Sequence, residues 1–340
     1  MARETKKVLS VSDDEFNQIN AENKSLFDEF MMYCQTVDLS KETIKVYRSN
    51  LRIFFVWYHK NCRGKSFIDV KKRDLMAFQN YLVTNGLSPS RVRILRSSIS
   101  SISNFIENVL DDEFPDFRNI TNKIPAPTLN PVREKTVMEE SQLEELLEKL
   151  ISLKKYQVAC FVAMAAYTGA RKSELVQYKR SFFTDDSVKG GLYVTPQIRT
   201  KGKGSMGKMM SKYGLKFKLD KYLELWDKER ERLGVDIDDL FVVRDGDSFR
   251  PAQQTTVDSY MKLCSKLLDM DCYCHSFRHF FVSNLVRADI PLEVIRDLVG
   301  HNDSSTTEIY NDVPKEDGFM KYFGEDGINK VEKKAIEDLQ

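Results

Sequence analysis

The chain has 340 residues, 41% of them hydrophobic, and a formal net charge of +1 at pH 7. This length predicts two domains, each large enough for its own core. No apolar run approaches the length of a membrane span, the N-terminus is polar and gives no sign of a signal peptide, and six scattered cysteines show no disulfide framework. We therefore expect neither a membrane protein nor a secreted one, but a protein of a reducing cytoplasm.

The first 112 residues predict a helical domain that follows a loose polar extension at 1–24. The domain is expected at 25–112, with amphipathic helices at about 25–37, 41–61, 70–86 and 89–109. Residues near which the helix caps would fall are Ser40, Asp69 and Ser88 or Ser90. Apolar residues recur at helical spacing in these segments. Examples of this spacing are Tyr47, Leu51, Phe54, Phe55 and Tyr58, and we interpret the aromatics among them as core rather than as base-stacking platforms.

Positive charge is concentrated in this helical domain. Thirteen Lys or Arg and three acidic residues lie between Lys41 and Arg96, so the segment carries 13 − 3 = +10. A localised excess of this kind is typical of a surface that binds a nucleic acid backbone. The residues of this segment that we expect to contact DNA are Lys41, Lys45, Arg48, Arg52, Arg91, Arg93 and Arg96.

Residues 113–134 lose helical periodicity and contain four prolines, which predicts an extended linker. A second, mostly helical domain is expected at 135–323, and its first helix runs from about Glu139 to Leu153. A β-hairpin is predicted from residues 191–200 and a returning strand at 215–219. Residues 324–340 form a tail that contacts either a neighbouring protomer or its own domain.

Three helical segments are predicted towards the end of the second domain. An apolar stripe at 280–286 suits a helix that packs on a core. The segment 291–300 has a proline near its start and a glycine just past its end, as helices often do. Asp303, Ser304 and Ser305 supply a cap for a short helix at 306–311.

Five side chains of the second domain have the chemistry to hold one phosphate against one tyrosine. Arg171 and Arg278 offer permanently charged forks that match phosphate oxygens. His275 and His301 can donate hydrogen bonds or move protons near neutral pH. The hydroxyl of Tyr310 can attack phosphorus and leave a phosphotyrosine. Because His275 and Arg278 are three residues apart, they share a helix face. The set predicts phosphoryl transfer without a metal.

These residues stand in three motifs through which the chain resembles the tyrosine recombinase, or phage integrase, family. The motifs are Thr168–Glu174, His275–His279, and Leu298–His301 followed by Tyr310 nine residues later. The N-terminal part also resembles the family's core-binding domain. The resemblance implies a mainly α fold, with a helical core-binding domain and an α-rich catalytic domain that carries a small antiparallel β-hairpin. We interpret Glu174 and His279 as groups that orient the arginines and histidines, with plain structural roles as the alternative.

The family also implies a lysine on a β-hairpin that protonates the leaving 5′-oxygen. Lys201 fits best because it ends the first strand of the predicted hairpin, and Lys203 is the alternative. The alternative interpretation of this Lys/Gly-rich loop is that its lysines are solvated and touch the DNA backbone, which suits Lys203, Lys208 and Lys212.

The resemblance implies a site-specific recombinase that cleaves and rejoins duplex DNA. In this scheme Arg171, Arg278 and His301 hold the scissile phosphate. His275 takes the proton of Tyr310, which forms a 3′-phosphotyrosine, and Lys201 protonates the leaving oxygen. No metal, ATP or other cofactor is expected. The implied partners are duplex DNA with paired recombination sites, three further copies in a homotetramer, and accessory DNA-bending proteins. The implied setting is the nucleoid of a prokaryote, phage or mobile element, with integration, excision or inversion as the reaction.

Other functions stay open on the sequence alone. A type IB topoisomerase or a telomere-resolving enzyme uses much the same chemistry, and a DNA-binding regulator could keep the fold without catalysis. A phosphatase or metal-dependent nuclease is least favoured, because no Asp, Glu and His cluster suggests a metal site. The run Cys272-Tyr273-Cys274-His275 lacks the usual spacing of zinc ligands.

Overall fold

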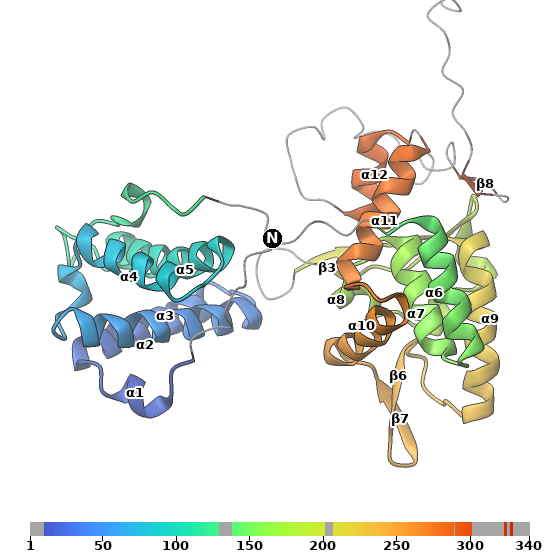
Figure 1. Ribbon diagram of the computed structural model, residues 1–340, viewed down its shortest axis with the longest axis horizontal. Coiled ribbons are helices and arrows are strands. Elements are labelled where there is room, and N and C mark those ends of the chain that lie inside the picture. Colours follow the sequence, from blue (N-terminus) through green and yellow to red (C-terminus); the bar gives the residue numbers. More distant parts are fainter. Residues whose placement is uncertain are drawn as a thin grey trace, which may run out of the picture. The chain divides into compact units, whose positions relative to one another are not determined.

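The computed structural model describes residues 10–128, 138–200, 207–288, 290–300, 323–324 and 327–328. The chain divides into two compact units whose boundary lies between Lys135 and Thr136 (Figure 1). Each unit has its own hydrophobic core. Within the described ranges, no helix combines the length and the apolar character that crossing a bilayer requires.

The N-terminal unit is helical. Its elements are α1 (Asp13–Asn17), α2 (Ala21–Thr36), α3 (Lys41–Asn61), η1 (Phe67–Asp69), α4 (Lys72–Thr84), α5 (Pro89–Val109) and η2 (Thr121–Lys123). The predicted helices at 41–61 and 89–109 are confirmed. Their N-caps are Ser40 and Ser88, whose side-chain oxygens accept hydrogen bonds from the backbone N–H groups of Thr43 and Arg91. Helix α4 is shorter than predicted, and its N-cap is Lys71 rather than Asp69.

Aromatic side chains fill the core of this unit, as predicted from their helical spacing. Phe54 is fully buried, and its ring centroid lies 5.1 Å from that of Phe78 and 5.5 Å from that of Phe67. Tyr58 stacks on Phe54 and donates a hydrogen bond to the Ser66 carbonyl, so its polar tip is satisfied. The interpretation of these rings as core rather than as base-stacking surfaces is confirmed.

Two expectations for this unit are wrong over the part that the structure describes. Residues from Ser12 onward are not loose, because Phe16 packs into the core and Arg52 binds Asp13 at 2.6 Å. Residues 113–128 are not an extended linker, because Phe117 and Ile124 are buried in the same core. The N-terminal segment is polar on average, but single apolar residues, such as Phe16, attach it to the core. The prolines of residues 113–128 end the helical periodicity but do not prevent the segment from packing on the core.

In the C-terminal unit, helices surround α7. The helices are α6 (Glu140–Ser152), α7 (Tyr156–Thr168), α8 (Lys172–Leu175), α9 (Lys216–Leu233), α10 (Gln254–Leu268), α11 (Cys274–Arg287) and α12 (Leu292–Val299), with 3-10 turns η3 (Arg180–Phe182) and η4 (Asp185–Ser187). Every residue of α7 from Val158 to Thr168 is buried, because α6, α9 and α11 pack around it (Figure 1). The predicted helices near 139–153, 280–286 and 291–300 are confirmed as α6, α11 and α12.

Small antiparallel sheets accompany these helices, which confirms the expected fold class. The strands are β1 (Val188–Lys189), β2 (Leu192–Val194), β3 (Ile198–Thr200), β4 (Lys208–Met210), β5 (Tyr213–Leu215), β6 (Val242–Asp245), β7 (Ser248–Pro251), β8 (Phe323–Gly324) and β9 (Gly327–Ile328). Strand β2 pairs with β1 and β5, with Leu192 opposite Leu215, and β3 pairs with β4. Strands β6 and β7 form a separate hairpin, as do β8 and β9.

The predicted returning strand at 215–219 is wrong. Strands β4 and β5 return the chain instead, and α9 begins at Lys216. The buried residues of α9 are Leu219, Leu223, Trp226 and Arg230, which recur at the three- and four-residue spacing of a helix. Five residues of alternating polarity were too few to distinguish a strand from the first turn of that helix.

Candidate active site

A glycine turn between α7 and α8 positions Arg171. Gly169 ends α7 with φ +60°, and the Thr168 hydroxyl accepts a hydrogen bond from the Ala170 N–H at 3.2 Å. A Cβ atom at position 169 would lie 2.4 Å from Cδ1 of Phe281 on α11. The turn therefore needs glycine for two reasons, its left-handed backbone and the close approach of α11.

Glu174 connects the backbone and the side chain of Arg171. Its Oε2 accepts a hydrogen bond from the Arg171 N–H at 2.8 Å, and its Oε1 accepts one from Arg171 Nη1 at 3.0 Å. The glutamate is fully buried, whereas the Arg171 side chain keeps 27% of its surface exposed. Burial opposes the ionisation of Glu174, but the Lys212 charge and the hydrogen bonds from Arg171 together hold the pKa of this carboxyl below its ordinary value.

Arg278 lies in α11 and reaches two other segments. Its Nη1 donates to the Gly169 carbonyl at 2.6 Å, and its Nη2 donates to the Val299 carbonyl at the end of α12 at 2.9 Å. These contacts join three elements that are far apart in the sequence. Burial, with repulsion from Arg171 in addition, lowers the pKa of the Arg278 guanidinium to about 10, so it stays protonated at neutral pH. An anion beside both arginines would relieve their repulsion.

His275 and His279 lie one turn apart on α11, with ring centroids 4.7 Å apart in an edge-to-face arrangement. His275 keeps access to solvent. Partial burial, together with His279 and the charges of Arg278 and Arg171, lowers the pKa of His275 below the ordinary 6.5. The ring is therefore neutral near pH 7 and able to accept a proton.

Lys212 was interpreted as a solvated loop lysine, and this interpretation is wrong. It lies between β4 and β5, its side chain is 1% exposed, and its Nζ is 3.1 Å from Oε2 of Glu174. Its N–H donates to the Thr195 hydroxyl at 2.8 Å, which holds the backbone in place. Burial lowers the pKa of the Lys212 ammonium, and the Glu174 carboxylate opposes that shift. In the sequence, Lys212 lies between Met210 and Tyr213 rather than among the glycines of the preceding loop, and this position could have indicated that it is buried.

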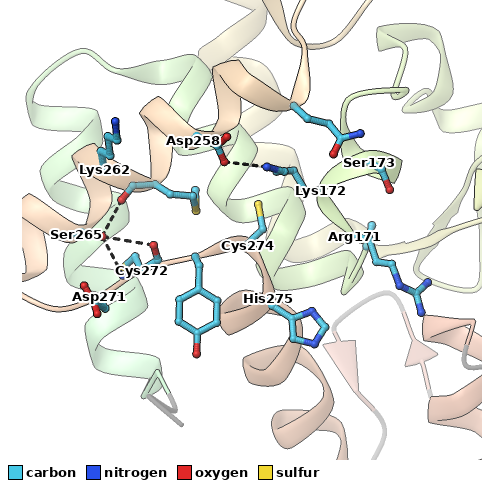
Figure 2. A pocket seen from close by; sticks show the side chains of 14 residues that line it. Arg171, Lys172, Ser173, Asp258, Lys262, Ser265, Asp271, Cys272, Cys274 and His275 are labelled. Atoms are coloured by element: carbon cyan, nitrogen blue, oxygen red, sulfur yellow. Dashed lines mark hydrogen bonds and ion pairs between the residues drawn. The ribbon is translucent and has the colours of Figure 1, made fainter. Parts of the chain in front are cut away.

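Arg171, Lys212 and Arg278 form a cationic site around Glu174. A cavity of about 710 Å³ adjoins this cationic site (Figure 2). Arg171 and His275 both line it, together with the segment that precedes α11. Lys172 and Asp258, which form an ion pair at 2.8 Å, also contribute to its wall. The predicted residues Arg171, Glu174, His275 and Arg278 are thus brought together by α8 and α11.

Other predicted site residues lie outside the described residues. They are Lys201, Lys203, His301 and Tyr310. The predicted short helix at 306–311 and most of the tail also lie outside the described residues. Gly300, which precedes His301, is described. It ends α12 with φ +68°, and a Cβ placed there would lie 3.3 Å from Lys212 Nζ. The chain therefore leaves α12 beside the cationic site.

The residues expected to contact DNA from the N-terminal unit fall into three groups. Lys41, Lys45 and Arg48 are exposed along one face of α3, at a spacing of four and three. Arg91 is half-buried in α5. The other arginines bind within the unit: Arg52 to the Ser12 carbonyl and Asp13, Arg93 to the Pro127 carbonyl, and Arg96 to the carbonyls of Thr121, Ile124 and Pro125. In the C-terminal unit, Lys208 is exposed on β4.

Known proteins resemble the chain over most of its length. The phage integrase family matches residues 136–317, and the N-terminal SAM-like domain of phage integrases matches residues 26–116. The SPbeta prophage-derived recombinase-like protein YomM of Bacillus subtilis is 28% identical over 89% of this chain and 90% of its own length. Tyrosine recombinase XerA of Pyrococcus horikoshii is 26% identical over 86% of this chain and 90% of its own length.

Solved structures share the fold. A lambda integrase(75-356) dimer bound to a COC′ core site matches 83% of this chain and 96% of its own, with 16% identity and a TM-score of 0.61. The XerH site-specific recombinase bound to a palindromic difH substrate matches 84% and 92%, with 18% identity and a TM-score of 0.61.

Proposed function

Because this chain belongs to the phage integrase family of tyrosine recombinases, we propose that it cleaves and rejoins DNA at specific sites through a 3′-phosphotyrosine intermediate. The observation that carries the proposal is the convergence of Arg171 and Arg278 beside one buried carboxylate, with His275 next to them. Such a site suits a phosphodiester, whose negative charge increases as a nucleophile attacks phosphorus.

The arginines keep donors for a phosphate after their internal contacts are counted. A guanidinium has five N–H groups. Arg278 uses one from each Nη for the carbonyls of Gly169 and Val299, and Arg171 uses one for Glu174. These internal hydrogen bonds hold both guanidinium groups in place, so their remaining donors can bind phosphate oxygens with little further ordering of the side chains.

In the proposed reaction, Tyr310 Oη forms a bond to the scissile phosphorus, and the bond from phosphorus to the 5′-oxygen breaks. His275 accepts the tyrosine proton, because its pKa is lowered and the ring is neutral near pH 7. Lys201, with Lys203 as the alternative, donates a proton to the leaving 5′-oxygen, and His301 adds a hydrogen bond to the phosphate. Attack by a 5′-hydroxyl reverses these steps. One phosphate ester replaces another, so the reaction needs no ATP.

The proposed partners are duplex DNA with paired sites and three further copies of the chain. A lambda integrase tetramer bound to a Holliday junction has the same fold, with a TM-score of 0.59. The exposed lysines and arginine of α3 suit contacts with backbone phosphates, which position a protein on DNA without selecting its sequence. We further propose that the reaction serves the integration, excision or inversion of a mobile element.

Trapping of the covalent intermediate tests the proposal. The protein is mixed with a pool of duplexes that carry a randomised core and a nick, so that the short 5′-hydroxyl fragment diffuses away after cleavage. We expect adducts that survive SDS, a shared sequence among the trapped DNAs, and none with Tyr310→Phe. DNA binding without adducts would instead identify a regulator that lacks catalysis. Relaxation of a plasmid that carries one selected site, without strand exchange between two, would identify a topoisomerase.

A further inference from the structure

Lys212 occupies an unusual place for a lysine, since its charge lies in the interior beside two arginines. Its side chain is 1% exposed, and its ammonium lies 3.1 Å from Oε2 of Glu174 and 3.5 Å from the Val299 carbonyl. Burying an ammonium is costly unless it is paired and hydrogen-bonded. A solvated role in DNA contact does not explain this position.

We propose that Lys212 is a positioning residue for strand cleavage, which occupies Oε2 of Glu174 and thereby leaves the Arg171 guanidinium available to the scissile phosphate. This proposal rests on the proposed function and extends it to a residue outside the three recombinase motifs.

The geometry at Glu174 supports this role. A carboxylate can bind a guanidinium through two parallel hydrogen bonds, one to each of its oxygens. Here only Oε1 accepts from the Arg171 side chain, because Oε2 is shared between the Arg171 N–H and Lys212 Nζ. Without Lys212, the carboxylate is free to bind the guanidinium through both oxygens. Arg171 would then be drawn towards Glu174 and away from the cavity that it lines.

The net charge around Arg171 supports the same role for Lys212. Arg171, Lys212 and Arg278 contribute +3 and Glu174 contributes −1, so these four side chains carry +2. A phosphodiester carries one negative charge and approaches two in the transition state of attack. Loss of Lys212 would lower the sum to +1. Its effect should therefore fall on the cleavage rate more than on the affinity for DNA.

Lys212 also connects the β-hairpin region to the end of α12. The Val299 carbonyl lies near Lys212 Nζ and accepts a hydrogen bond from Arg278 Nη2 at 2.9 Å. Gly300 follows, and a Cβ there would approach both Lys212 Nζ and the side chain of Met210. The Lys212 N–H donates a hydrogen bond to the Thr195 hydroxyl, and this bond holds the Lys212 backbone in place. The Lys212 ammonium therefore has a defined position between Glu174 and the end of α12.

These interactions favour positioning over proton donation. A general acid delivers its proton to the leaving oxygen, so at least one N–H must face the substrate. The Lys212 ammonium is enclosed, and it binds a carboxylate and approaches a backbone carbonyl of the protein itself.

A double-mutant cycle with two substrates tests this role. Four versions of the full-length chain are compared: the wild type, Lys212→Met, Glu174→Gln and the double variant. Lys228→Met is the control for loss of an exposed lysine from the same unit. The substrates are a nicked duplex of the sequence selected from the randomised pool and the same duplex with a sulfur in place of the scissile 5′-bridging oxygen. A thiolate leaves without protonation, so the sulfur substrate bypasses a general acid. Single-turnover rates and DNA affinity are measured.

We expect Lys212→Met to lower the cleavage rate on the order of 100-fold, as for the loss of one preorganised donor, and to change DNA affinity less than about threefold. In the Glu174→Gln background, where the carboxylate can no longer capture Arg171, the same substitution should cost less than about threefold. This comparison remains informative if the single variant does not fold. The defect of Lys212→Met should persist on the sulfur substrate, and Lys228→Met should match wild type.

Three results would overturn the proposal. One is a wild-type rate in Lys212→Met, and another is an equal loss in both backgrounds, because Lys212 would then not act through Glu174. The third is rescue of Lys212→Met by the sulfur substrate, which would make Lys212 the proton donor. Absence of any adduct with the wild-type chain is a separate outcome, since it would refute the proposed function itself.

Discussion

Replacement of Gly169 by alanine should destabilise the C-terminal unit and disturb the cationic site together. A residue with a side chain costs about 1 kcal/mol or more at φ +60°. The new Cβ would lie 2.4 Å from Phe281, whose ring is buried and cannot retreat freely. Overpacking of this kind costs roughly 1–3 kcal/mol. We therefore expect a loss of about 2–4 kcal/mol in the free energy of unfolding.

Urea denaturation followed by tryptophan fluorescence measures this loss. The chain has two tryptophans, one in each unit, and Trp226 is buried in the C-terminal core. A Trp57→Phe background therefore reports the C-terminal unit alone. Gly234→Ala is the matched control, because Gly234 has φ +71° but no described atom lies within 4 Å of its Cβ position. It should show only the backbone cost, about 1 kcal/mol.

The clash with Phe281 is then isolated by a second substitution. Phe281→Ala removes the ring atoms nearest to position 169, so Gly169→Ala should cost less in that background than in the parent. Cleavage should also fall in Gly169→Ala, since the Gly169 carbonyl accepts from Arg278 Nη1. A stability loss no larger than that of Gly234→Ala would refute the steric reasoning.

Three further predictions concern proton transfer, DNA binding and the N-terminal unit. The pKa of His275 is lowered below 6.5, and its neutral form accepts the tyrosine proton, so the single-turnover cleavage rate should show an acid limb centred below pH 6.5. An acid limb centred above pH 6.5 would contradict this assignment. Replacing Lys41, Lys45 and Arg48 by glutamine should reduce the slope of log affinity against log salt by about 0.9 for each phosphate that is no longer neutralised, whereas an unchanged slope would exclude α3 from the DNA interface. Arg96→Met should destabilise the N-terminal unit by about 2–3 kcal/mol, measured through Trp57 fluorescence in a Trp226→Phe background, because Arg96 binds three backbone carbonyls; a loss equal to that of Arg48→Met would show that these bonds contribute nothing.

Local pattern was sufficient for helices α3 and α5, but it led us to predict a strand where α9 begins. Helices α3 and α5 begin and end where their apolar spacing and serine caps predict, because an amphipathic stripe and a capping hydroxyl act within one turn of the chain. The motifs at Arg171 and at His275 to Arg278 were also readable, since each is a short run of residues. The structure places all three residues in one site, although Tyr310, His301 and Lys201 stay predictions.

Tertiary contacts decided the roles of the charged side chains. Arg96 and Lys212 both lie in segments rich in positive charge, and their spacing gave no reason to separate them from Lys41 or Lys208. Arg96 turned out to hold the carbonyls of a segment about thirty residues later in the chain, and Lys212 binds Glu174 and approaches Val299. A charge is stable in an interior only where distant segments supply its partners. No periodicity within a helix or strand carries that information, so the fold had to show which lysines and arginines remain free for DNA.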